Sequence, residues 1–506
     1  MPLNCQISIT WSLRPENCGG SAACKQTLIR ARKTLMILIY KRECALTLLA
    51  LLAWAPGMCG QHLVTVDVDA TLEHLEITVR PAAAVSRLGA RSERASRYVD
   101  DVSGCNGEHL EARGRHIESR KPLGCFRYRI DLRSAAASDR RNATLDRNNV
   151  LVSPSLWLWR PLDRRRADTV VAFRLPEGTA VSAPWQSLGD NRYRIRPSPR
   201  SASAAVAFGA FHAATREVPG ATLDIAMMKP RGDRAPLQLL DWVASAASNV
   251  ALGYGRFPNP EPHVVVIPVG GSRRGSSSPV PFGRVIRDGG ESVELFVNQN
   301  AALDRFYADW TATHEFSHFM LPYVSWRQRW ISEGFAQYYQ NVLLARAGQY
   351  DTRRAWQKLY EGFERGRRAR PELSPNEATE QRPHGATMKI YWSGAALAFE
   401  ADVELRRRSG GTRSLDTVLE EFAVCCLPSA ETWSGRRLFR ALDDIAGDAV
   451  FMPLYDRYAN AEGFPDYRAV MEALGLDVRG GRIIEADDAA LASIRDAIMS
   501  PPPPAD

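Results

Sequence analysis

The sequence HEFSH at residues 314–318, followed by WISEGFA at residues 330–336, decides the interpretation of this chain. On a helix, positions i and i+4 lie on one face, so His314 and His318 can both point an imidazole at a single ion. Glu315 lies about 100° round the same helix, beside the position where a water would bind. A catalytic zinc lowers the pKa of such a water to about 7, and a neighbouring carboxylate can take its proton. We therefore predict a metal site with Glu315 as its general base.

A second helical segment supplies the third ligand. The first helix carries several aromatic residues, and two buried imidazoles are costly unless they are hydrogen-bonded or ligated. Pro322 ends that helix. A further amphipathic run begins at Ser332, and Glu333 in its first turn is the acid suited to complete a site for one zinc ion. The alternative is a solvated helix with two incidental histidines and a glutamate favoured by a helix dipole.

Length and composition place the chain among globular proteins. It has 506 residues, of which 45% are hydrophobic, so it is long enough for two or three domains with real cores. This composition excludes a disordered chain and a polytopic membrane protein. The net charge is +8, but the basic residues are scattered among acids and no nucleic-acid-binding motif is recognisable. We expect no nucleic-acid partner.

Residues 1–60 have the features of a leader sequence. A short apolar run at 44–56 follows two basic residues and precedes small residues, which is the layout of a secretory signal peptide. Because the run lies far from residue 1, translation starting at Met36 would explain its position. We expect cleavage near Gly60 and a periplasmic or secreted protein. Lipid attachment at Cys59 or an uncleaved membrane anchor are the alternatives.

Four cysteines lie beyond the leader. Cys105 and Cys125 flank a turn-rich segment at a separation that suits a disulfide in an oxidising compartment, and two free buried thiols are the alternative. Cys425 and Cys426 are adjacent, and adjacent cysteines rarely bridge each other.

The pattern of hydrophobic residues predicts an α+β multidomain protein. Residues 61–229 contain short alternating runs separated by turn residues, which is typical of a β-sandwich. Residues 230–480 contain a few strands and then mainly helices, and form the predicted catalytic domain. Residues 481–506 are expected to be a partly disordered tail. The main helices are expected at roughly 302–321, 332–347, 352–366, 386–408, 414–423, 434–445, 448–459 and 466–474.

Several motifs in one order give the chain a family resemblance. HEFSH, the run WISEGFAQYY and the later IYWSGAA at 390–396 resemble the gluzincin peptidases, closest to the glycyl aminopeptidase-like family. The resemblance covers about residues 150–476. It implies a β-rich N-terminal domain followed by a thermolysin-like, mainly helical zinc peptidase domain. It also implies that Tyr391 donates a hydrogen bond to the tetrahedral oxyanion, with zinc held by His314, His318 and Glu333 and with Glu315 as the base.

Two departures from the family pattern affect the expected specificity. Only residues 319–332 separate the second histidine from the glutamate ligand, which is a short loop. The glycine-rich signature that places a substrate-binding acid is degenerate, and its nearest match is Gly289-Gly290-Glu291. Glu291 could bind a substrate ammonium group if it faces the cleft, and an exposed glutamate at a strand end is the alternative.

The expected function is that of an exported zinc peptidase. We expect an aminopeptidase whose peptide substrate pairs with the strand Val293 to Val297. The alternatives are a zinc endopeptidase and a non-catalytic exported binding protein that keeps the peptidase fold.

Overall fold

The computed structural model describes residues 60–146, 149–162, 167–195, 204–228, 237–269, 278–287, 291–486 and 490–501. Gln61–Asp506 form one compact unit. The predicted signal segment, with its proposed start and anchoring cysteine, lies outside the described residues. Within the described ranges, no helix is both long and apolar enough to cross a bilayer.

A seven-stranded sheet organises the described N-terminal residues, in the order β13-β14-β11-β1-β2-β7-β4. The sheet is mixed, because β1 pairs in parallel with β11 and antiparallel with β2. β2 alternates buried with more exposed residues, as expected for a strand with one face on a core. The strands are β1 (His62–Val68), β2 (His74–Arg80), β4 (Val99–Gly104), β7 (Phe126–Asp131), β11 (Thr169–Arg174), β13 (Gln186–Ser187) and β14 (Arg192–Ile195).

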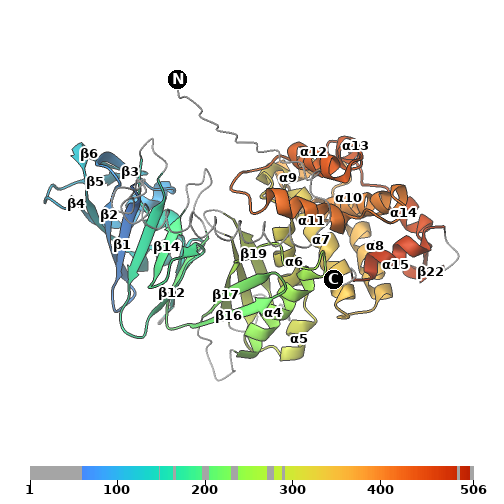
Figure 1. Cartoon of the computed structure of the whole chain (residues 1–506), viewed down its shortest axis with the longest axis horizontal. Coiled ribbons are helices and arrows are strands. Elements are labelled where there is room, and N and C mark those ends of the chain that lie inside the picture. Colours follow the sequence, from blue (N-terminus) through green and yellow to red (C-terminus); the bar gives the residue numbers. More distant parts are fainter. Residues whose placement is uncertain are drawn as a thin grey trace, which may run out of the picture. The chain divides into compact units, whose positions relative to one another are not determined.

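Two four-stranded sheets complete this region, in the orders β10-β3-β6-β5 and β12-β15-β9-β8. All three sheets contribute side chains to one buried cluster, in which Trp157 packs edge-on against Phe173. The predicted β-rich N-terminal region is therefore confirmed (Figure 1). The elements are β3 (Val85–Gly89), η1 (Glu93–Arg97), β5 (Glu111–Arg113), β6 (His116–Leu123), α2 (Leu132–Ser138), β8 (Ala143–Asp146), β9 (Asn149–Val152), α3 (Pro154–Trp157), β10 (Arg160–Pro161), β12 (Ala180–Ser182) and β15 (Val206–Gly209).

A five-stranded sheet precedes the helices that carry the site motifs, in the order β16-β17-β18-β20-β19. β17, β18 and β20 run parallel, while β16 and β19 pair antiparallel at the two edges. Its strands are β16 (His212–Val218), β17 (Ala221–Met227), β18 (His263–Val269), β19 (Phe282–Ile286) and β20 (Ser292–Asn298).

This sheet begins earlier in the chain than the sequence suggested. The sequence predicts a domain boundary between residues 229 and 230, but β16 and β17 precede that point and belong to the five-stranded sheet. An alternating strand pattern shows that a strand has a buried face, whereas the choice of partner depends on contacts remote in sequence.

Helices dominate the chain beyond residue 298, as predicted (Figure 1). α4 packs against β16 and β17, and α6 packs against β19 and β20. The helices are α4 (Leu237–Ala251), α5 (Leu303–Tyr307), α6 (Thr311–Ser317), η2 (His318–Met320), η3 (Trp326–Gln328), α7 (Arg329–Arg346), α8 (Thr352–Arg368), α9 (Pro375–Gln381), α10 (Thr387–Arg408), α11 (Leu415–Cys426), α12 (Gly435–Ala446), α13 (Phe451–Tyr458), α14 (Tyr467–Ala473) and α15 (Ala492–Met499).

α7 and α10 cross with their backbones in contact. A Cβ atom added to Gly394 would lie 2.1 Å from the carbonyl oxygen of Trp330, and one added to Gly334 would lie 2.2 Å from the Cα of Gly394. Only a residue without a side chain permits this approach. The crossing therefore brings the N-terminal parts of the two helices together.

Part of the predicted tail is folded. β22 (Arg482–Glu485) pairs with β21 (Leu476–Arg479), and α15 follows. Arg346 of α7 donates two hydrogen bonds to the carbonyl oxygen of Ile498, of 3.0 and 2.8 Å. This long-range contact anchors α15, and no sequence pattern within the tail itself predicts the contact.

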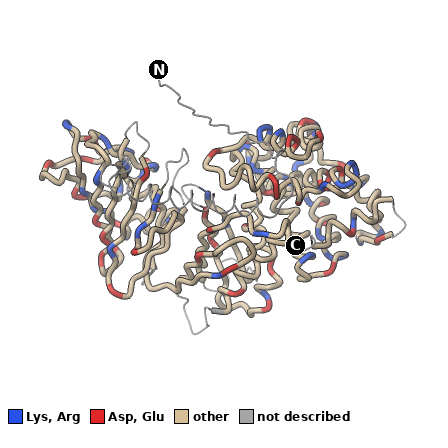
Figure 2. The backbone as a smooth tube through the Cα atoms, viewed as in Figure 1, with Lys and Arg blue, Asp and Glu red and all other residues tan. Residues whose placement is uncertain are grey.

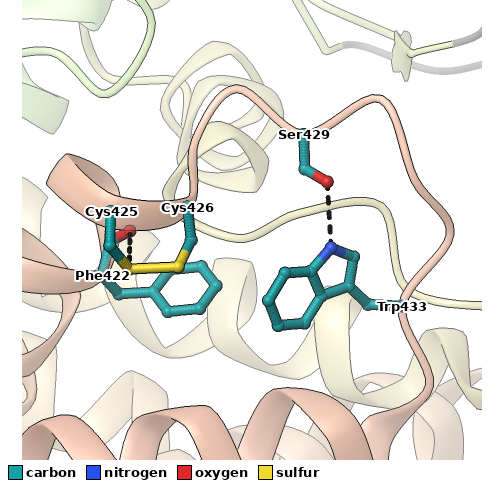
Figure 3. Close-up of a disulfide and its surroundings, with 5 residues drawn as sticks. All are labelled: Phe422, Cys425, Cys426, Ser429 and Trp433. Atoms are coloured by element: carbon teal, nitrogen blue, oxygen red, sulfur yellow. Dashed lines mark hydrogen bonds between the residues drawn. A yellow bond between two sulfur atoms is a disulfide. The ribbon is translucent and has the colours of Figure 1, made fainter. Parts of the chain in front are cut away.

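Both cysteine pairs beyond the leader form disulfides. Cys105 and Cys125, which the sequence left open, are bridged with their Cα atoms 5.4 Å apart. The expectation that Cys425 and Cys426 stay unbridged is wrong, because the structure joins them at the end of α11 (Figure 3). Their Cα atoms are 3.8 Å apart, the spacing across an ordinary trans peptide.

Charged side chains of both signs are interspersed along the described chain (Figure 2). Glu364, for example, is paired with three arginines, Arg367, Arg368 and Arg468. Such mixing of signs is typical of a solvated protein surface.

Candidate metal centre

α6 and η2 carry the histidine pair. The sequence predicted one helix over 302–321, but the structure divides it into α5, α6 and η2. The break before α6 coincides with Asp309, whose Oδ1 accepts a 2.8 Å hydrogen bond from the Thr311 N–H. His314 lies inside α6 and His318 opens η2, and both side chains are buried.

The two histidines and Glu333 converge on one point. Each offers one ligand atom, and these atoms all lie within 4.8 Å of one another. Glu333 Oε2 is 3.4 Å from His314 Nε2 and 3.6 Å from His318 Nε2. Two imidazole nitrogens and a carboxylate oxygen are the donor set that a catalytic zinc takes, with a fourth position open. The residues present therefore fit a zinc ion.

The other ring nitrogens are held by α7. His314 Nδ1 lies 2.9 Å from Gln340 Oε1, and because an amide oxygen only accepts, Nδ1 carries the proton and Nε2 is free to bind a metal. His318 Nδ1 lies 2.9 Å from Ser332 Oγ. Such outer contacts fix the orientation of metal-binding histidines. α7 thus provides Glu333 and both supports.

The four titratable side chains His314, Glu315, His318 and Glu333 strongly influence one another's pKa values. Burial opposes the charged form of Glu333, but its hydrogen bonds with the imidazoles hold its pKa well below the usual range. Burial also opposes the protonated form of His314, yet the hydrogen bond with Glu333 and the nearby Glu315 raise the pKa of His314. Burial lowers the pKa of His318 to about 4. His318 is therefore neutral, as a metal ligand must be.

Glu315 lies under the edge strand β19. Burial raises the pKa of Glu315 to about 7, and its carboxylate accepts a hydrogen bond from the Val285 backbone. A Cβ atom on Gly283 would lie 2.7 Å from Glu315 Cγ, so a side chain at that position would displace the carboxylate. A glycine in this strand permits the close approach.

Tyr391 reaches the cluster from the second turn of α10. Its ring stacks on that of His314, with centroids 5.9 Å apart and planes 20° apart. Burial raises its pKa, so the phenol keeps its proton at neutral pH. The charges of Glu333 and Arg329 also act on the pKa of the phenol, Glu333 raising it and Arg329 lowering it.

The same part of the chain carries a family signature. Residues 322–396, which include Glu333 and Tyr391, match the family of M61 glycyl aminopeptidases. This match and the metal-ligand set support an aminopeptidase-like zinc metallopeptidase that resembles the gluzincins.

Solved structures share the fold of this chain. It is similar to an aminopeptidase N family protein from Idiomarina loihiensis, with 14% identity and a TM-score of 0.63, over 83% of this chain and 79% of the other. It is also similar to an M1 zinc metallopeptidase from Deinococcus radiodurans, with 15% identity and a TM-score of 0.48, over 80% of this chain and 95% of the other. The first likeness supports an M1-like arrangement of a sheet-rich region and a helical part. No curated protein matches the chain.

Among the residues that the structure describes, no contact links Glu291 to the metal centre. Glu291 directly precedes β20, where its Oε2 accepts a 3.3 Å hydrogen bond from Asn259 and its carbonyl accepts one of 3.1 Å from the His263 N–H. The expected pairing edge is also wrong. Val293–Val297 lie in β20, which is paired on both sides, and the edge of the sheet is β19.

Sequence reasoning missed three residues of the candidate metal centre. Gln340 follows Glu333 by seven positions, a spacing that places both on one helix face and could have revealed it. Arg329 precedes Glu333 by four positions, a spacing that could also have revealed it. Ser332 carries no such signal, because its partner His318 lies on another helix.

Proposed function

We propose that this chain is an exported zinc aminopeptidase. The observation that carries the proposal is the convergence of His314, His318 and Glu333, with Glu315 and Tyr391 beside them. Zinc, when bound, polarises the scissile carbonyl and lowers the pKa of the attacking water. Side chains of the protein itself carry out the remaining steps of the proposed reaction.

Glu315 is the proposed general base. Its carboxylate takes the proton of the attacking water and later passes it to the leaving amine. A pKa of about 7, caused by burial, suits a group that must both accept and release a proton near neutral pH. The hydrogen bond from the Val285 backbone fixes its orientation.

Tyr391 is the proposed oxyanion donor. The phenol keeps its proton at neutral pH and lies against His314, so it can donate to an oxygen that becomes negative in the transition state. A hydrogen-bond donor that already lies beside this oxygen stabilises the transition state more than it stabilises the bound substrate.

The substrate is proposed to pair with β19. This strand is the edge of the sheet and passes directly over Glu315, so an extended peptide added to it would place a peptide bond beside the base. The family match favours an aminopeptidase. The apolar run near residue 50 and the Cys105–Cys125 disulfide support export to an oxidising compartment.

Glu315→Gln tests the catalytic proposal. The amide keeps the size of the side chain but cannot take a proton, so kcat should fall by roughly 10²–10⁴ while zinc stays bound. Glu177→Gln, at an exposed turn residue, is the matched control and should leave activity unchanged. Full activity of Glu315→Gln with stoichiometric zinc would refute the mechanism.

The position of cleavage is tested separately. A peptide with a free amino terminus is compared with the same peptide carrying an acetyl group. An aminopeptidase cleaves only the first. Equal cleavage of both peptides would show an endopeptidase, and cleavage of neither by zinc-loaded protein would favour a non-catalytic binding protein.

A further inference from the structure

Trp310 is an exposed aromatic residue beside the metal centre. It caps the N-terminus of α6 in a helical conformation, four positions before His314 and eight before His318, so the three side chains share one helix face. The indole meets the His314 ring edge-on, with centroids 5.6 Å apart and planes 86° apart. The rings of His314 and His318 are in turn 5.0 Å apart. The three rings therefore form a row that runs up to the metal position.

Trp310 is the solvent-facing end of this row. His314 and His318 are buried, whereas Trp310 is 43% exposed. Part of the indole is used in the contact with His314, and much of the rest lies open to water. A single exposed apolar residue is ordinary on a protein surface, but several gathered at one place mark a site of interaction.

Two further exposed apolar side chains lie around the same centre. Phe282 is exposed at the start of β19, directly before the glycine that approaches the proposed general base. A Cβ atom on that glycine would also lie 3.0 Å from Cγ2 of Thr311, which follows Trp310, so β19 and α6 are in contact there. Met388 is exposed on α10, three positions before Tyr391, and residues at this spacing are neighbours on a helix. Exposed apolar residues thus occur on the edge strand, on α6 and on α10.

We propose that Trp310 is a specificity-determining residue that binds a large apolar side chain of the substrate next to the scissile bond. This inference rests on the proposed function, because the scissile bond must lie at the metal position. A bond held there is one imidazole ring away from the indole. The side chain of a residue that flanks the bond is long enough to cover that distance.

The chemistry of an indole favours an aromatic or branched aliphatic partner. Tryptophan presents a broad and rigid apolar surface, and an aromatic ring gains from stacking on it in addition to the burial of both surfaces. A polar side chain would lose water at this surface without gaining a hydrogen-bond partner from the ring face. Glycine has no side chain that could reach the indole, so a glycine peptide provides the reference rate.

Peptides that differ in one residue test this selectivity. Phe, Gly or Lys is placed on the amino side of the scissile bond in one series and on the carboxyl side in another, at saturating zinc. In one of the two series, kcat/KM for the Phe peptide should exceed that for the Gly peptide by at least about tenfold. Trp310→Ala should reduce this ratio to below about threefold, mainly through KM, because the contact forms in the bound substrate as well as in the transition state.

Trp326→Ala is the matched control. Trp326 is an exposed tryptophan of η3, and its ring lies 5.5 Å from the guanidinium of Arg382; among the described residues it makes no ring contact with His314 or His318. The control should keep the ratio. Trp310→Phe retains a smaller ring and should give an intermediate ratio. Zinc affinity, measured by chelator competition, should change in none of these variants by the roughly 10- to 100-fold that follows loss of an outer-shell contact.

Distinct results would overturn the inference. These are a wild-type enzyme that favours the Phe peptide in neither series, a ratio retained in Trp310→Ala, and an equal loss for the Phe and Gly peptides, which would show that Trp310 only supports His314. Faster cleavage of the Lys peptide than of the Phe peptide would show that the indole binds a cation instead.

Failure of the proposed function is distinguishable from failure of this inference. If zinc-loaded wild-type protein hydrolyses no peptide, the proposed function fails. Calorimetric binding of the Phe and Gly peptides to Glu315→Gln then decides the role of Trp310 without turnover. Tighter binding of the Phe peptide that is lost when Trp310→Ala is added would support the contact, and equal binding of both peptides would refute it.

Discussion

Gly394→Ala should push α7 away from α10 and so change the positions of the site residues on the two helices relative to each other. The added Cβ would lie 2.1 Å from the Trp330 carbonyl oxygen, and ordinary contact begins at 3.4 Å. The difference, 3.4 − 2.1 = 1.3 Å, is the minimum local displacement. The obstacle is helix backbone, which cannot rotate away as a side chain can. Tyr391 on one helix would then shift relative to Glu333 on the other.

Both stability and activity report this shift. Overpacking a close helix contact costs about 1–3 kcal/mol of folding free energy. Misplacing a catalytic group by roughly 1 Å can lower kcat/KM by about 10²-fold. The free energy is measured by urea unfolding followed by circular dichroism, and kcat/KM is measured at saturating zinc on a free-amine peptide.

Gly124→Ala is the control, because its added methyl group meets nothing within 4 Å. It should change neither measurement. A Gly394→Ala variant that is destabilised but fully active would refute the idea that the crossing sets the distance between Tyr391 and Glu333. A variant with unchanged stability would refute the contact itself.

Two further outcomes follow from the buried charges. Zinc affinity should fall by about tenfold per pH unit below the pKa of His314, because zinc must displace its proton. Contact with Glu333 raises that pKa above the ordinary histidine value of about 6.5 despite burial, so the decline begins at a higher pH than for an unperturbed histidine; an affinity measured by competition that is flat between about pH 8 and pH 6 would contradict this. Arg346→Met should lower the unfolding free energy by about 3–5 kcal/mol. The change removes the ion pair that Arg346 makes with the buried Asp416 carboxylate, and the Ile498 carbonyl oxygen loses its hydrogen bonds from Arg346. Arg113→Met, at an exposed pair, should leave the urea midpoint unchanged, and equal midpoints for both variants would show that the buried network contributes nothing.

The sequence alone predicted the three residues that the structure brings together as a possible metal site. Two histidines four positions apart on a helix must share a face, and this local rule holds wherever the helix packs. The sequence also predicted a sheet-rich first part and a helical second part, because periodicity reports whether a segment has one buried face. These inferences need only near neighbours along the chain.

The tertiary structure decided which elements meet. It placed β19 rather than β20 at an edge of the five-stranded sheet, included β16 and β17 in that sheet, and joined Cys425 to Cys426. It also stacked Tyr391 of α10 on His314 and packed α7 against α10 where Gly334 meets Gly394. Such contacts join residues far apart in sequence, where no local spacing limits the choice of partner. That choice depends on packing of the whole domain, which is why only the structure could show it.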